Sequence, residues 1–240
     1  MILYDKINYL DMNKTLYKIL TLVVLPVVIA AMCFFIVRGV MKPVKFEKER
    51  VAREAVAIQR LKDLRTIQTA FKSEVGHYAS TFDSLKMFYN TGAITVDLQI
   101  GSMDDSLAVE NTKALKKKNP KISSAELLQR AQAGERLVFN IPTKLAVKDT
   151  LFHNREGFVI DSIFVIPFCG KPVQMQTIIK TVSGVQVPLF EASMPYRDLL
   201  KGMDNQLRIN LDADRQASNR YEGLMVGSIS VPNNNAGNWE

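Results

Sequence analysis

One uninterrupted apolar stretch near the amino terminus constrains this chain more than any other feature. Residues 19–37 (ILTLVVLPVVIAAMCFFIV) carry no charge, and Thr21 is their only polar side chain. At a helical rise of 1.5 Å per residue the stretch spans about 28 Å, close to the ~30 Å hydrocarbon core of a bilayer. A buried core helix is the alternative, but such helices rarely lack a polar face over five turns. The pattern therefore predicts a transmembrane helix over residues 19–41, in which Pro26 is tolerated.

The residues around this stretch indicate an uncleaved anchor rather than a signal peptide. The apolar run exceeds the roughly 7–15 residues of a signal-peptide core, and Arg38 and Lys42 follow it in place of a small-residue cleavage site. We expect residues 1–18 to form a short cytoplasmic amino terminus. The flanking charges favour the opposite orientation, with the large domain in the cytoplasm, because basic residues are enriched on the cytoplasmic side of a membrane helix. Six basic residues follow the stretch within positions 38–53, and only three precede it. That rule weakens for long translocated domains.

A second long helix is expected over residues 42–76, after a short break at Gly39 and Pro43. Its apolar positions recur at spacings of three, four or seven, and Gly76 is suitably placed to end it as a C′ cap. The apolar stripe is too weak for a fully buried helix and too regular for a linker. The helix is therefore a candidate assembly surface, and its proposed contact residues are Val51, Ile58, Leu61 and Leu64.

The remaining residues, 77–240, predict an α+β domain in which an antiparallel sheet carries a helical insertion over residues 104–134. Within the insertion, Ser123 and Glu126 form a capping box, and Gly134 ends the helix. Alternating and apolar runs predict a short helix over 81–89, an extended piece over 93–98, and strands over 137–141, 158–168, 173–182, 185–190 and 224–231. Ser183-Gly184 is a two-residue hairpin connection, whereas residues 206–221 fit either helix or strand.

This organisation resembles the type IV pilins and pseudopilins. The resemblance is carried by residues 64–71 (LRTIQTAF), by Gly76-His77-Tyr78 and by Phe82-Asp83-Ser84-Leu85. It implies a membrane helix that continues into a long helix packed on an antiparallel sheet. Pilins are cleaved after a glycine before the apolar segment and carry a glutamate at the fifth mature position. Residues 1–18 contain no glycine and residues 19–37 no glutamate, so the resemblance implies a pilin-shaped protein that is not processed as a pilin.

A second resemblance bears on topology. The chain as a whole, which ends in Asn-Asn-Asn-Ala-Gly-Asn-Trp-Glu, resembles single-span proteins of Bacteroidota. Asp followed by Ser or Thr and a small or aliphatic residue resembles the acceptor pattern of their extracytoplasmic O-glycosylation system. The pattern occurs four times beyond the apolar stretch, which makes the candidate acceptors Ser84, Ser106, Thr150 and Ser162. The alternative is that Asp-Ser and Asp-Thr start turns before strands. Together with the pilin-like layout, the four sites favour a periplasmic domain.

Little in the sequence indicates catalysis. Neither Cys33, in the membrane segment, nor Cys169, after an apolar run, has a histidine nearby in sequence, and we interpret His77 and His153 as turn and surface residues. The chain has no GxGxxG, phosphate-loop or HExxH motif. We therefore expect a protein that is not an enzyme, with no cofactor and no metal ligands.

One basic cluster is a candidate for anion binding, and its members are Lys113, Lys116, Lys117, Lys118 and Lys121. No aromatic residue lies among them, so a solvated helix face is the simpler interpretation and no nucleic acid is expected. The favoured hypothesis is a non-catalytic, single-pass inner-membrane protein. It would serve a secretion-like or pilus-like envelope complex and contact envelope proteins, or itself, through the long helix. The alternative is a cytoplasm-facing module that binds nucleic acid or acidic lipid through residues 113–121.

Overall fold

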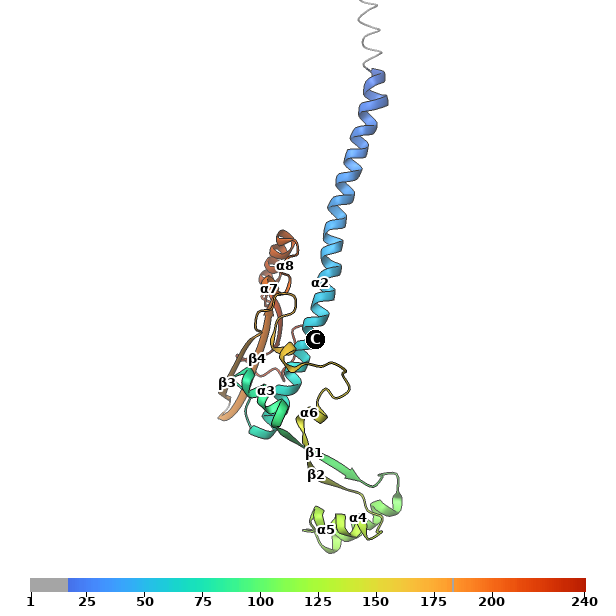
Figure 1. Ribbon diagram of the computed structural model, residues 1–240, viewed down its shortest axis with the longest axis vertical. Helices are drawn as coiled ribbons and strands as arrows, with labels where there is room; N and C mark the ends of the chain where they lie inside the picture. The colour runs from blue at the N-terminus through green and yellow to red at the C-terminus, as the bar shows by residue number, and fades with distance from the viewer. Residues whose placement is uncertain (1–16, 183) are drawn as a thin grey trace, which may run out of the picture.

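The computed structural model describes residues 17–182 and 184–240, and its longest element is one helical rod (Figure 1). The rod covers Tyr17–Val75, 59 residues. It consists of a π-helical turn, η1 (Leu20–Val24), and the helix α2 (Leu25–Val75), with three further helical residues before η1. The break expected at Gly39 and Pro43 is wrong, because α2 runs through both residues. A proline inside a helix removes one hydrogen bond, and the intact turns on either side keep the helix continuous.

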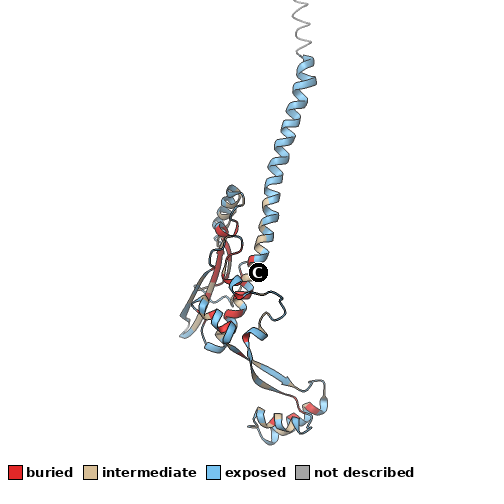
Figure 2. Ribbon diagram, viewed as in Figure 1, coloured by how far each residue is buried: buried red, intermediate tan, exposed pale blue. Residues whose placement is uncertain are grey.

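Burial changes abruptly along this rod (Figure 2). Residues 17–45 are all exposed, whereas the buried residues of α2 begin at Ala57 and end at Gln68. The helix ends at Gly76, as predicted: this glycine has φ +88°, and its N–H donates to the Lys72 carbonyl at 2.8 Å. The expected amino-terminal segment lies almost entirely outside the described residues.

A three-stranded antiparallel sheet packs against the buried part of α2, in the order β3 (Gln174–Val182), β4 (Val185–Pro195) and β5 (Gly223–Gly227). The predicted hairpin is confirmed, since Val182 pairs with Val185 across the connection. The sheet face toward the main core supplies the fully or almost fully buried side chains Phe190, Ala192, Met194, Leu224 and Val226. We call this unit, α2 from Ala57 onward with its sheet and covering helices, the body.

Short helices complete the body: α3 (Phe82–Thr91), α6 (Val147–Thr150), η2 (Ile160–Phe164), α7 (Tyr196–Leu199) and α8 (Asn205–Ala217). The strand predicted over 158–168 is wrong, because its centre forms the 3-10 helix η2. Ile160, Ile163 and Phe164 are all buried, and a helical turn is what brings residues three and four apart to one face. The segment that fitted either helix or strand forms α8.

The helical insertion is carried away from the body on a two-stranded antiparallel ribbon of β1 (Ala93–Ile100) and β2 (Phe139–Ala146). Its helices are α4 (Ser106–Lys118) and α5 (Ser124–Gln132). Asp105 is the N-cap of α4, and Ser123 is the N-cap of α5, as predicted. Figure 1 shows this unit, which we call the arm, at the end of the molecule opposite the apolar helix. The predicted α+β class is confirmed.

Candidate functional site

The amino-terminal half of the rod is the first candidate site. It is the one helix in the described part of the chain that is long and apolar enough to cross a membrane, and its most apolar window is entirely unburied. Large side chains point outward all round, as Leu22 (80% exposed) and Phe35 (70% exposed) illustrate. A helix that is apolar on every side and covered by no protein is suited to lipid. Its length and composition fit a membrane anchor or a signal sequence.

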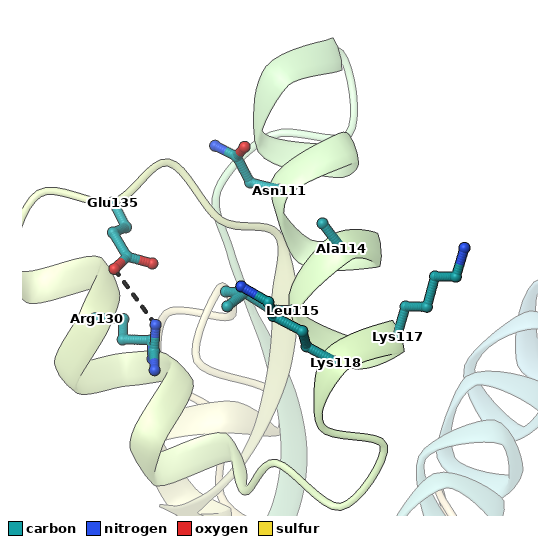
Figure 3. Close-up of a pocket in the computed structure, with 7 residues that line it drawn as sticks. All are labelled: Asn111, Ala114, Leu115, Lys117, Lys118, Arg130 and Glu135. Carbon is teal, nitrogen blue, oxygen red and sulfur yellow. Dashed lines mark ion pairs between the residues drawn. The ribbon is translucent and has the colours of Figure 1, made fainter.

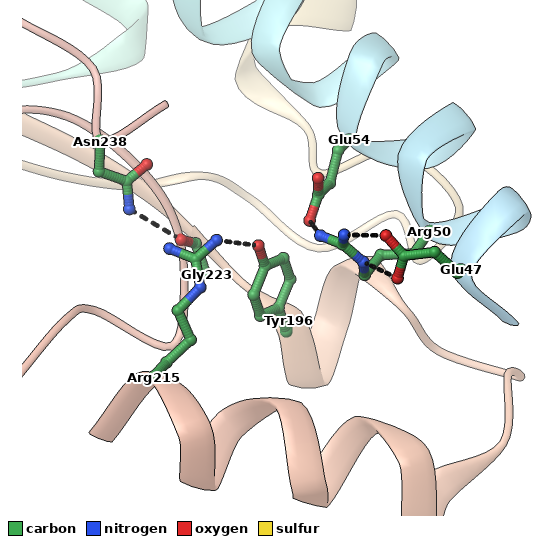
Figure 4. Close-up of polar contacts among 7 residues, drawn as sticks. All are labelled: Glu47, Arg50, Glu54, Tyr196, Arg215, Gly223 and Asn238. Carbon is green, nitrogen blue, oxygen red and sulfur yellow. Dashed lines mark hydrogen bonds and ion pairs between the residues drawn. The ribbon is translucent and has the colours of Figure 1, made fainter. Parts of the chain in front are cut away.

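Two groups of polar contacts lie close together where α2 passes α7 and α8, one within α2 and one between Tyr196 and Arg215 (Figure 4). Arg50 of α2 lies between Glu47 and Glu54, donating from Nη1 to Glu54 at 2.5 Å and from Nε to Glu47 at 2.9 Å. These bonds to Arg50 hold the pKa of the Glu47 carboxyl below its usual value. The Tyr196 hydroxyl accepts a hydrogen bond from Arg215 at 2.8 Å. Burial, followed by the nearby Glu54, raises the pKa of Tyr196, so its hydroxyl stays protonated.

Two arginines fix α2 to loops that are distant in sequence. Arg53 donates to the carbonyls of Leu199 and Lys201 at 3.3 and 2.8 Å. Farther along, Arg155 makes two hydrogen bonds, 2.5 and 2.7 Å long, to the buried carboxylate of Asp63. Hydrogen bonding to Asp63 raises the pKa of Arg155. Sequence reasoning missed these contacts because the Asp63–Arg155 pair spans 92 residues and has no local signal.

The proposed assembly residues on α2 are separated by the structure. Leu61 and Leu64 are 0% exposed and belong to the core of the body, so assigning them to a contact with another protein is wrong. Ile58 is partly buried against the same core, whereas Val51 is 52% exposed. The stripe appeared weak in sequence because only one part of the helix has a sheet to cover it.

The four candidate acceptors all lie in helical segments, α3, α4, α6 and η2, rather than in turns before strands. Ser106 and Ser162 are exposed, and the Ser162 hydroxyl donates to the Val159 carbonyl at 2.7 Å. Ser84 and Thr150 are half-buried, and Thr150 donates to Ala146 at 2.9 Å. The Asp-Ser pattern is thus in part a helix-start signal, as Asp105 shows by capping α4.

The five lysines of the basic cluster are all exposed on the arm. Lys117 and Lys118 line a cavity of about 750 Å³ between α4 and α5, together with Arg130 and Glu135. Figure 3 shows the Lys118 side chain reaching toward Arg130, while Lys117 points the other way. Arg130 forms an ion pair with Glu135, in which Nη1 of Arg130 is 3.6 Å from Oε1 of Glu135. The cavity therefore offers one lysine and a partly neutralised arginine.

The residues considered for catalysis are not brought together. His77 lies in the turn after α2 and His153 is exposed near α6. Cys33 is exposed on the apolar helix, and Cys169 is half-buried. No group of three His, Cys, Asp or Glu side chains within residues 17–182 and 184–240 is arranged to hold a metal ion.

Fold and geometry together define a class: a long amino-terminal apolar helix that continues into an α+β domain. No family model matches the chain, and no curated protein or solved structure matches it either.

Proposed function

We propose that this chain is a non-catalytic, single-pass inner-membrane protein whose pilin-like α+β domain lies in the periplasm. There it would act as a structural or assembly component of a cell-envelope complex. The observation that carries the proposal is the double role of α2. Its first half has the composition of a membrane span, and its second half supplies the core of the body. Any force on the body is therefore passed to the anchor through one unbroken helix.

The contacts of Arg53 support a mechanical role. Arg53 lies where α2 enters the body and donates to the carbonyls of Leu199 and Lys201, whereas the bonds of Arg50 and Arg53 to glutamates lie within α2 itself. The two bonds to carbonyls help to fix the angle between the membrane helix and the body. A rigid junction is useful to a protein that positions a surface at a set height above a bilayer.

The remaining contact surface on α2 faces away from the body. It consists of exposed small and polar side chains, namely Ala52, Ala55, Gln59, Lys62 and Thr66. These residues recur at spacings of three and four, so they share one helix face. We assign association with other envelope proteins or with a second copy to this face.

Topology is the first test. A reporter that is active only outside the cytoplasm is fused after Glu240 through a flexible linker, because the Glu240 side chain accepts a hydrogen bond from Arg65 at 2.7 Å. A second fusion carries a reporter that is active only in the cytoplasm. We expect activity from the first fusion alone. Activity from the second alone, at equal expression, would overturn the periplasmic assignment.

Association is tested by cysteine crosslinking in intact membranes, with Cys33 and Cys169 replaced by serine. Ala55→Cys on the proposed face should give a crosslinked species. Ser106→Cys, which is also exposed but lies on the arm, is the matched control and should give much less. Equal yields at both positions would contradict the assignment of the α2 face.

A second candidate function has one observation in its favour, the cavity beside Lys117 and Lys118. In this alternative the domain faces the cytoplasm and binds an anionic partner, either nucleic acid or acidic lipid. It predicts binding that weakens as salt increases, and a further loss in the Lys117→Gln, Lys118→Gln double variant. Binding that does not change with salt would remove it.

A further inference from the structure

An apolar groove lies between α2 and α8, directly beyond the apolar helix. It encloses about 750 Å³. From α2 it is lined mainly by Pro43, Val44, Phe46 and Val51, and from α8 by Leu207 and Leu211. Val44 and Val51 are 55% and 52% exposed, so the groove is open rather than filled by the protein's own side chains.

The polar side chains of the groove are few. Glu47 is bound by Arg50, which donates from Nε at 2.9 Å. Lys48, Asn210 and Asp214 supply the remaining polar atoms. A ligand for this groove therefore needs a long apolar part and little polarity along it.

The groove continues the apolar surface of the proposed membrane span. Val40 and Met41 are 58% and 45% exposed, and Pro43 follows two residues later, about 3 Å along the helix axis. The headgroup layer on each side of a bilayer is about 5–7 Å thick. With Met41 at the hydrocarbon boundary, the groove begins within the headgroups and extends outward from them.

One basic side chain lies at the groove itself, because Lys48 is part of its lining. Lys42 and Lys45 are also exposed, but Lys45 falls on the opposite side of α2 from its groove-lining neighbours Val44 and Phe46. A lysine near a membrane surface is attracted to anionic lipid phosphates. An apolar groove with a lysine in its lining, close to a membrane surface, matches both ends of a phospholipid.

We propose that the groove holds an acyl chain of an anionic glycerophospholipid from the adjoining leaflet, with its phosphate near Lys48. The chain packs between Val44 and Val51 of α2 and Leu207 and Leu211 of α8. The bound lipid fills the space between the two helices and so fastens α8 to the rod. This inference rests on the proposed membrane anchoring.

Photocrosslinking in vesicles tests the inference. A benzophenone amino acid replaces Val51 in the full chain, which is reconstituted in phosphatidylglycerol and irradiated, and adducts are identified by intact mass. The matched control places the same amino acid at Ala52, which is also exposed but does not line the groove. Both positions lie about 15 Å beyond Met41, farther out than the headgroup layer, so bulk lipid does not reach either. We expect a lipid adduct at position 51 and at least about tenfold less at position 52, which corresponds to a preference of about 1.4 kcal/mol.

Each other outcome is decisive. Equal lipid labelling at both positions means that the bilayer covers the whole surface, and an adduct of twice the protein mass from position 51 means that a second copy occupies the groove. Either result overturns the inference, as does the absence of an adduct at position 51. Equal labelling from phosphatidylcholine would overturn the role of Lys48. Alkaline carbonate extraction is run in parallel: a chain released by carbonate contradicts the membrane anchoring itself, whereas a retained chain without adduct contradicts only the lipid site.

Discussion

The body and the arm solve the problem of burial in different ways. In the body, α2 and the sheet bury a continuous core of more than twenty residues. In the arm, the core consists of Leu127, Leu137 and Phe139, with partly buried neighbours around them. The ribbon β1–β2 connects the helices of the arm to the body (Figure 1).

Because of this difference, we expect the body and the arm to differ in their stability against unfolding. The body depends on a helix that is also the proposed anchor, so its fold and its attachment are linked. A small core on a two-stranded ribbon is marginal by comparison, since two strands alone are scarcely stable in water. We therefore expect the arm to open locally while the body stays folded.

The largest effect is expected from the centre of the body. Leu61→Ala removes a fully buried side chain from α2 and should lower the free energy of unfolding by about 3 kcal/mol. Val56→Ala, at a position that is 41% exposed on the same helix, should change it by less than about 0.5 kcal/mol. Urea unfolding of the detergent-solubilised chain, followed by the fluorescence of Trp239, measures both. If both variants lost the same free energy of unfolding, the face of α2 that carries Val56 would have to be covered in the folded protein, which would contradict this expectation.

The arm provides the next test. Leu127→Ala should destabilise the arm by about 2 kcal/mol, because Leu127 is almost fully buried in its small core. Hydrogen exchange should then increase over residues 104–138 and remain unchanged over 57–75. Increased exchange in both regions would contradict the separation of body and arm.

A smaller effect is expected at the pair that ties residues 151–159 to the rod. Arg155→Ala leaves the buried Asp63 carboxylate with the Gln59 amide, 2.9 Å away, as its remaining partner. Because the Arg155 side chain is 41% exposed and solvent screens the pair, we expect a loss of about 1 kcal/mol in the free energy of unfolding. Arg155→Lys keeps the charge but not the paired geometry, so it should lose less. Identical losses in the two variants would mean that only the paired geometry matters.

The smallest effect concerns pH at the end of the chain. The bond from Arg65 lowers the pKa of Glu240 below its ordinary value of 4.5. A lowered pKa stabilises the folded tail above pH 4.5, and this contribution disappears as the pH falls through the lowered value. Trp239 is the only tryptophan and lies beside Glu240, so its emission should shift to the red on acidification. Glu240→Gln should show the shifted emission already at pH 7; an unchanged spectrum there would contradict the role of this contact.

Local signals in the sequence were sufficient wherever a few neighbouring residues decide the structure. The long apolar helix, the Gly76 cap, the Ser123 cap and the hairpin at 183–184 all depend on hydropathy, capping or turn geometry. These elements form as predicted, as does the α+β class, and the apolar helix is long and apolar enough for a membrane span or a signal anchor. The pilin-like resemblance, the periplasmic orientation and the use of the acceptor sites remain predictions.

Only the tertiary structure decided which apolar residues of α2 are core and which are surface. Val51 and Leu61 belong to the same weak stripe, yet one is 52% exposed and the other 0%. The choice depends on where the sheet packs, and the sheet is formed more than a hundred residues later. The 3-10 helix at Ile160–Phe164, the Asp63–Arg155 pair and the groove beside α8 arise in the same way. Burial is a property of the assembled fold, so residue type and spacing determined the rod but not what covers it.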